Sequence, residues 1–215
     1  MFRVVFSLLA VLMLAACSGD KIYAPDEVVA RSHYVDPNPP SITLITSINT
    51  RNKTGAHSAL IINGAERVLY DPAGSWENPA APERYDLHYG FTPAMLSYYT
   101  DYQGTYPYEV TQQTIFVTPA IAAQVMQAAI ARGSVPEAQC TNAISTILRG
   151  TPGFSSVEST WYPKQFAKSF GSLPGVIERK ITSVDGVKKL TLPGSQPLTV
   201  IPILPAAVPA PVPAG

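Results

Sequence analysis

The 215-residue chain carries fifteen Lys and Arg against fifteen Asp and Glu, so its formal net charge at pH 7 is zero. A balanced chain without a long basic run offers no electrostatic basis for binding nucleic acid, which we therefore exclude as an expected partner. Hydrophobic residues make up 46% of the sequence. A chain of this length and composition has room for one domain with a substantial core.

The first seventeen residues, "MFRVVFSLLAVLMLAAC", have the pattern of an export signal. Arg3 precedes an apolar stretch, Val4 to Leu14, which is short for a permanent membrane span and typical of a secretory signal peptide. The ending Leu-Ala-Ala-Cys resembles the bacterial lipobox, whose cysteine is lipidated and becomes the mature N-terminus. We expect residues 1–16 to be removed and acyl chains on Cys17 to hold the protein on a membrane. An ordinary signal peptide, cleaved near the same place, is the alternative.

Two further segments flank the expected domain. Residues 17–40 contain the proline-rich "DPNPP" and are predicted to tether the domain to the membrane. Residues 193–215, rich in Pro and Ala, are predicted to form an extended tail. Ser18 rather than Asp follows Cys17, which by the lipobox resemblance favours the outer membrane, facing the periplasm. The domain itself is then expected over residues 41–192.

The first half of this domain shows strand patterns. "SITLITSI" at 41–48 is rich in β-branched residues, and "AHSALII" at 56–62 and "RVLYD" at 67–71 are joined by Asn-Gly turn chemistry. These three predict an antiparallel meander. A proline-rich loop follows, because prolines at that density do not fit inside a strand ladder.

The second half adds helices to further strands. Thr-Pro pairs predict N-caps for helices at 92–103 and 118–133, and hydrophobic spacing predicts helices at 140–150 and 162–170. Strands are expected at 108–117, 176–184 and 188–192, the last two forming a hairpin through Asp185-Gly186. The predicted fold class is α+β, with an antiparallel sheet packed against helices.

Cys140 stands directly before the helical pattern in "EAQCTNAISTIL". If Cys17 is acylated, Cys140 has no partner for an intramolecular disulfide, and a lone thiol in an exported protein favours either a catalytic role or a small buried apolar residue. A thiol attacks a carbonyl group as the thiolate, and both a helix N-terminus and a neighbouring imidazole stabilise that form. The backbone N–H of Cys140, with the side chain of Gln139, would stabilise an oxyanion.

His57, which opens the strand "AHSALII", is the candidate for the imidazole. Folding the 56–71 segment into a hairpin brings Asp71 towards the His57 end, where its carboxylate would orient the ring. Tyr70 is the poorer candidate for that role, and "DPAG" is also ordinary turn chemistry. His33 in the tether and His88 in the loop are rivals to His57. No His, Cys and Asp spacing predicts a zinc site, and no cofactor is expected.

A histidine opening a strand, an orienting residue one hairpin later and a cysteine at a helix start resemble the circularly permuted NlpC/P60 branch of the papain-like superfamily. That branch includes the lecithin:retinol acyltransferase-like proteins and bacterial envelope relatives, and its histidine precedes its cysteine. The resemblance covers roughly residues 41–170 and implies a permuted papain-like fold and a Cys-His site. The acyltransferase relatives have Asn-Cys-Glu-His where this chain has "QCTN", so Cys140 alone carries over from that motif. A caspase-like site also puts histidine first, but its cysteine does not open a helix.

Three functions remain open from the sequence. The first is a lipid-anchored cysteine hydrolase that cleaves an amide bond in the cell envelope, and the resemblance implies peptidoglycan peptides as its substrate. The second uses the same dyad for acyl transfer or lipid deacylation, because the permuted relatives include lipid-acting enzymes. The third is a non-catalytic lipoprotein that binds an envelope partner through its tyrosine-rich loop or its tail.

Overall fold

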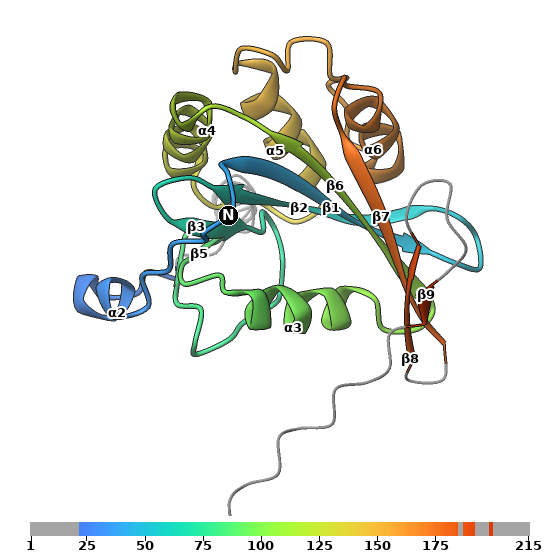
Figure 1. Cartoon of the computed structure of the whole chain (residues 1–215), viewed down its shortest axis with the longest axis horizontal. Helices are drawn as coiled ribbons and strands as arrows, with labels where there is room; N and C mark the ends of the chain where they lie inside the picture. Colours follow the sequence, from blue (N-terminus) through green and yellow to red (C-terminus); the bar gives the residue numbers. More distant parts are fainter. Residues whose placement is uncertain (1–21, 185–186, 192–197, 200–215) are drawn as a thin grey trace, which may run out of the picture.

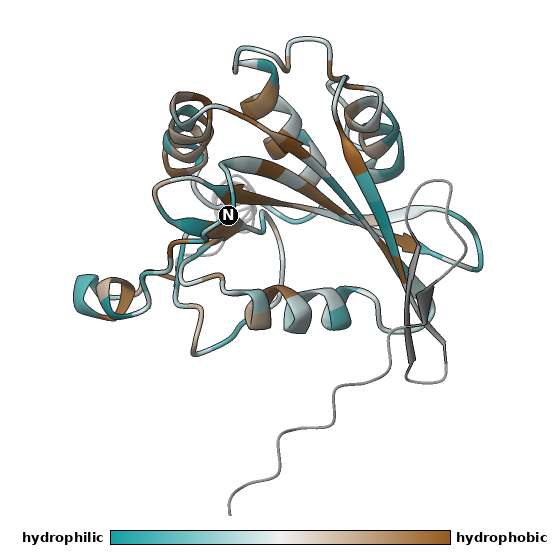
Figure 2. Ribbon diagram, viewed as in Figure 1, coloured by the Kyte–Doolittle hydropathy of each residue, from teal (hydrophilic) through white to brown (hydrophobic). Residues whose placement is uncertain are grey.

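The computed structural model describes residues 22–184, 187–191 and 198–199. Over these residues the chain forms one antiparallel sheet with helices on both faces (Figure 1). The α+β class with an antiparallel sheet is therefore the observed architecture. Hydrophobic residues run along the strands between the helical layers (Figure 2).

The sheet has nine strands in the order β4-β5-β3-β2-β1-β6-β7-β8-β9. Its centre is β1, which pairs with β2 on one side and with β6 on the other along its whole length. The strands are β1 (Ser41–Asn49), β2 (Gly55–Asn63), β3 (Arg67–Tyr70), β4 (Glu83–Arg84), β5 (Leu87–His88), β6 (Tyr108–Phe116), β7 (Ile177–Val184), β8 (Val187–Thr191) and β9 (Leu198–Thr199).

Three helices cover one face of this sheet: α4 (Pro119–Arg132), α5 (Cys140–Arg149) and α6 (Pro163–Gly171) (Figure 1). The core on this side joins strand residues such as Leu60 with α5 residues such as Ile144 and with Phe166 of α6. Every second side chain of a strand points to the same face, so Leu60 and Ile62 of β2 both enter this core. This layer fixes the N-terminus of α5 against β2.

The opposite face is covered in part by α3 (Pro93–Gln103). A smaller core on this side contains Ile45, Ile61, Trp76, Phe91 and Tyr99. Thr-Pro caps begin both α3 and α4, as the sequence predicts: the Thr92 side chain accepts a hydrogen bond from Met95 N–H, and Thr118 from Ile121 N–H.

The segment predicted as a tether packs against the domain from residue 22 onward. It contains a short helix, α2 (Asp26–Arg31), and the Ala24 N–H donates to the carbonyl oxygen of Glu83. Asp36 forms a buried ion pair with Arg67 of β3. The folded unit thus begins upstream of the predicted boundary at residue 41. The sequence does not predict this extension, because these contacts join residues far apart in the chain and leave no periodic pattern.

The strands and helices expected within 41–184 are all present, with ends that differ by one or two residues. The two-residue strands β4 and β5 were not predicted, because they lie in a loop too rich in proline to show alternation. The signal peptide, Cys17, the Asp185-Gly186 turn and the tail from residue 193 lie outside the described residues. Within the described part of the chain, no helix combines the length and hydropathy needed to span a membrane.

Candidate active site

Cys140 is the first residue of α5, and only 6% of its surface is exposed. The first N–H groups of a helix have no partner within the helix, so this position carries a positive potential that favours an anion. The sulfur also accepts a hydrogen bond from the backbone N–H of Ser58 and lies 3.7 Å from the Thr141 hydroxyl. The local structure therefore favours the thiolate.

Ser58 is free to make this contact because β3 is shorter than β2. The pairing of β2 with β3 ends at Leu60 and Tyr70, so β2 continues towards its start without a strand on that side. The N-terminal turn of α5 lies beside this unpaired part of β2. There, the Thr141 hydroxyl donates to the Ser58 hydroxyl at 3.3 Å, and both residues are fully buried.

His57 lies beside Ser58 near the start of β2 and contacts both Asp71 and Cys140. Its Nε2 is 2.5 Å from Oδ1 of Asp71, and a second hydrogen bond joins the ring to the Cys140 sulfur. With Nε2 engaged by the carboxylate, Nδ1 is the nitrogen available to the sulfur. The His57 side chain is 17% exposed and the Asp71 side chain 1%. The structure thus brings the three residues together in the order Cys140, His57, Asp71.

Asp71 is held in turn by Tyr99 of α3. The Tyr99 hydroxyl donates to Oδ1 of Asp71 at 2.6 Å and accepts from the Gln103 side-chain amide at 3.0 Å. Trp76 packs edge-on against the Tyr99 ring, with 5.3 Å between the ring centroids. Tyr99 was not singled out from the sequence, because its neighbour Tyr98 has the same side chain and only the helix orientation shows which ring turns inward.

These contacts shift the pKa values of all three groups. Burial disfavours the charged form of each, but the interactions between them outweigh it. The charge and hydrogen bond of Asp71, with a smaller contribution from Cys140, raise the pKa of His57 to about 10. The pKa of Cys140 is lowered by His57 and by the Ser58 N–H, and the pKa of Asp71 is lowered by His57 and Tyr99. Together these shifts favour a thiolate on Cys140, an imidazolium on His57 and a carboxylate on Asp71.

Of the other candidate residues, Gln139 adjoins Cys140, and the rest lie apart from this cluster or make other contacts. Gln139 precedes α5, and its side chain makes no capping hydrogen bond to the helix. The Tyr70 hydroxyl donates to the carbonyl oxygen of Gly133, so it does not orient His57. His33 is exposed beside Glu66. His88 is buried, and Trp76 packs edge-on against its ring.

Among the described residues, no three or more His, Cys, Asp or Glu side chains are grouped so as to hold a metal ion. Comparison of the chain with protein-family models, curated proteins and solved structures found no match. The geometry of the cluster is therefore the basis on which a function is argued.

Proposed function

We propose that the chain is a lipid-anchored cysteine hydrolase of the cell envelope, which cleaves an amide bond through Cys140, His57 and Asp71. The observation that carries the proposal is the position of the His57 ring between the thiol and the buried carboxylate. A non-catalytic lipoprotein would not need this arrangement. Keeping Asp71 ionised in the interior is costly unless its charge is paired.

The proposed reaction begins with the Cys140 thiolate, which attacks the carbonyl carbon of the amide and forms a tetrahedral intermediate. The backbone N–H of Cys140 at the helix N-terminus and the Gln139 side chain stabilise its oxyanion. The His57 imidazolium then donates its proton to the leaving nitrogen, the C–N bond breaks, and a thioester remains on Cys140.

Hydrolysis of the thioester regenerates the site. Neutral His57 takes a proton from water, the resulting hydroxide attacks the thioester carbonyl, and the carboxylic acid product leaves as the C–S bond breaks. The thiolate and the imidazolium are thereby restored. Asp71 stays ionised throughout, holding the ring in place and stabilising its positive form.

The proposed setting and substrate follow from the N-terminal pattern and the family resemblance. Lipidation of Cys17 would anchor the protein to the outer membrane on its periplasmic side, where peptidoglycan stem peptides supply the amide bond. The order His57, Asp71, Cys140 along the chain supports membership of the circularly permuted NlpC/P60 branch. We include that membership, and the permuted papain-like fold, in the proposal.

The test is to incubate the full chain with purified sacculi and, separately, with phospholipid vesicles. We expect soluble peptide fragments from sacculi, lost in Cys140→Ala and retained in His33→Ala, which removes an exposed histidine away from the site. Fatty acid released from the vesicles, without peptide from sacculi, would instead assign the same dyad to lipid deacylation. Peptide release that persists in Cys140→Ala would overturn the mechanism.

A further inference from the structure

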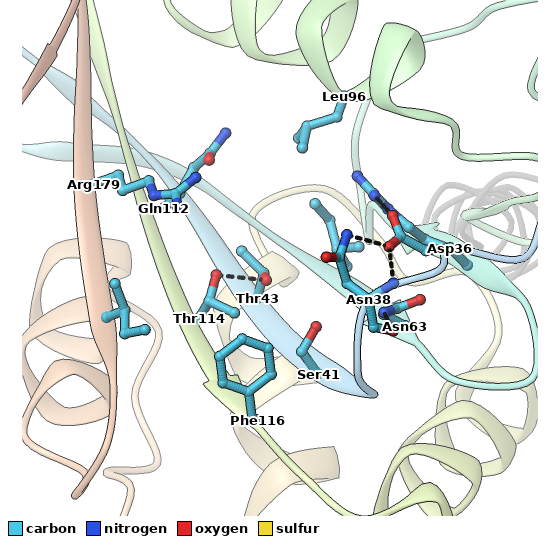
Figure 3. Close-up of a pocket in the computed structure, with 13 residues that line it drawn as sticks. Asp36, Asn38, Ser41, Thr43, Asn63, Leu96, Gln112, Thr114, Phe116 and Arg179 are labelled. Carbon is cyan, nitrogen blue, oxygen red and sulfur yellow. Dashed lines mark hydrogen bonds and ion pairs between the residues drawn. The ribbon is translucent and has the colours of Figure 1, made fainter.

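A groove lies on the face of the sheet that carries α3, at the far end of β2 from His57. The groove has a volume of about 260 Å³, and the segment around Asp36, the strands β1, β2, β3, β6 and β7, and Leu96 of α3 line it. Figure 3 shows Arg179 and Gln112 on one side, Asp36 and Asn38 on the other, and Thr43 with Thr114 between them. Its size suits a ligand of about one sugar ring.

Two buried polar atoms at this groove lack hydrogen-bond partners among the residues that the structure describes. They are Oδ1 of Asn63 and Nε of Arg67, whose residues are 4% and 8% exposed. Buried polar atoms are nearly always paired, because an unpaired one keeps the cost of its lost hydration. Asn63 and Arg67 therefore leave one acceptor and one charged donor unpaired in the wall of the groove.

The charges around the groove favour an anion. Asp36 is occupied: it pairs with Arg67 and accepts hydrogen bonds from the backbone and side chain of Asn38. The second arginine, Arg179, is exposed on β7 and has no further carboxylate among the lining residues to balance it. Guanidinium groups bind carboxylates with two parallel hydrogen bonds, so the excess charge suits that group.

The rest of the lining is neutral and mixed in character. The hydroxyls of Thr43 and Thr114 are 2.8 Å apart, and because one donates to the other, the accepting hydroxyl keeps its own hydrogen for a ligand. Phe116 and Ile177, both about half exposed, form an apolar border. Hydroxyl and amide groups beside an exposed aromatic ring match a sugar, which has polar edges and apolar C–H faces.

We propose that this groove binds a saccharide bearing a carboxylate, with the carboxylate at Arg179 and the ring against Phe116 and the threonine hydroxyls. The site is independent of Cys140 and His57, which lie at the other end of β2. Through this site the protein would bind an acidic glycan independently of the reaction that Cys140 catalyses.

The test is calorimetric titration of the full chain with N-acetylmuramic acid and with N-acetylglucosamine, two sugars that differ only in the 3-O-lactyl group, which carries the carboxylate. We expect the first to bind and the second to bind at least tenfold more weakly. Arg179→Gln should lower the affinity for N-acetylmuramic acid at least tenfold, and Thr114→Val should lower it severalfold. Lys180→Gln is the matched control: it loses the same charge on the neighbouring residue of β7, whose side chain points to the other face, and should leave affinity unchanged.

Three results would overturn the proposal: equal affinity for the two sugars, binding of inorganic phosphate as tight as that of N-acetylmuramic acid, or full affinity in Arg179→Gln. Cys140→Ala should bind N-acetylmuramic acid with unchanged affinity. This variant separates the groove from the proposed hydrolysis, because it removes the nucleophile and leaves the arginines in place.

Discussion

His57 and Asp71 lie on the same face of the sheet, although Asp71 comes after the end of β3 and His57 near the start of β2. The register of the two strands, with Asn63 opposite Arg67 and Leu60 opposite Tyr70, makes this possible. Continued by one residue, the same register puts Asp71 opposite Ala59, which shares its face with His57. A slip of one residue would put Asp71 opposite Ser58 and turn its carboxylate to the other face.

Asp71→Asn tests whether this carboxylate activates the thiol. Because the charge of Asp71 raises the pKa of His57, its loss should lower that pKa, reduce the imidazolium fraction and raise the pKa of Cys140. We expect alkylation of Cys140 by iodoacetamide at neutral pH to slow at least tenfold, and its pH midpoint to move upward. Asp26→Asn, at a highly exposed carboxylate paired with Arg84, is the control. An unchanged alkylation profile in Asp71→Asn would contradict the proposed role.

Tyr99→Phe tests the second hydrogen bond to Asp71. That hydrogen bond helps to lower the pKa of Asp71, and a group with a lowered pKa contributes stability that is lost as pH falls through its folded-state value. Removing the hydroxyl should raise that pKa, so the acid unfolding midpoint moves to higher pH. The free energy of unfolding at pH 7 should fall by about 1–3 kcal/mol. Tyr98→Phe, at a mostly exposed ring on the same helix, should change neither quantity.

Much of the fold is local in origin, which is why the sequence predicts it. The β-branched run over 41–48 and the Thr-Pro pairs that begin α3 and α4 specify their elements through neighbouring residues alone. Likewise, Cys140 is recognisable because the apolar spacing of α5 starts right after it. The two-residue strands β4 and β5 exist only through pairing with β3, with each other and with the segment around Tyr23, so no local pattern could reveal them.

The candidate site is predictable only as far as it depends on such patterns. His57 and Cys140 follow from a strand start and a helix start, and Asp71 from a hairpin. The Ser58 N–H could not be anticipated, since it is free for the sulfur only because β3 ends at Tyr70. Tyr99 depends on how α3 is rotated against the sheet, which the polar and aromatic residues of that helix leave open.

Gly74→Ala should displace Asp71 without changing any titratable group. A Cβ at residue 74 would lie 2.1 Å from Oδ2 of Asp71 and 2.8 Å from its backbone oxygen, so the carboxylate or the turn must move. We expect slower alkylation of Cys140 together with a lower melting temperature. Gly150→Ala, whose Cβ would meet its nearest neighbour at 3.6 Å, is the control and should be close to wild type. Wild-type alkylation in Gly74→Ala would show that the position of the carboxylate is not critical.

The pairing of His57 with Asp71 should also appear as a pH-dependent contribution to stability. Cys140→Ser isolates it, because that variant removes the sulfur, the smaller contributor to the raised pKa of His57. Below pH 6.5 the folded and unfolded forms both carry the proton, and the contribution is complete. As pH rises towards the folded-state pKa of His57, about 10 with the sulfur present, the folded form holds a proton that the unfolded form has lost, and the contribution declines.

The measurement is urea unfolding of Cys140→Ser and of the double variant Cys140→Ser, His57→Gln between pH 6 and 10. The difference in unfolding free energy between them should shrink with rising pH, at a slope of at most about 1.4 kcal/mol per pH unit for one proton. In Cys140→Ser, Asp71 stays ionised over this whole range because His57 and Tyr99 lower its pKa. A difference that stays constant from pH 6 to 10 would mean that His57 is neutral in the folded protein, and the proposed thiolate–imidazolium pair would then be wrong.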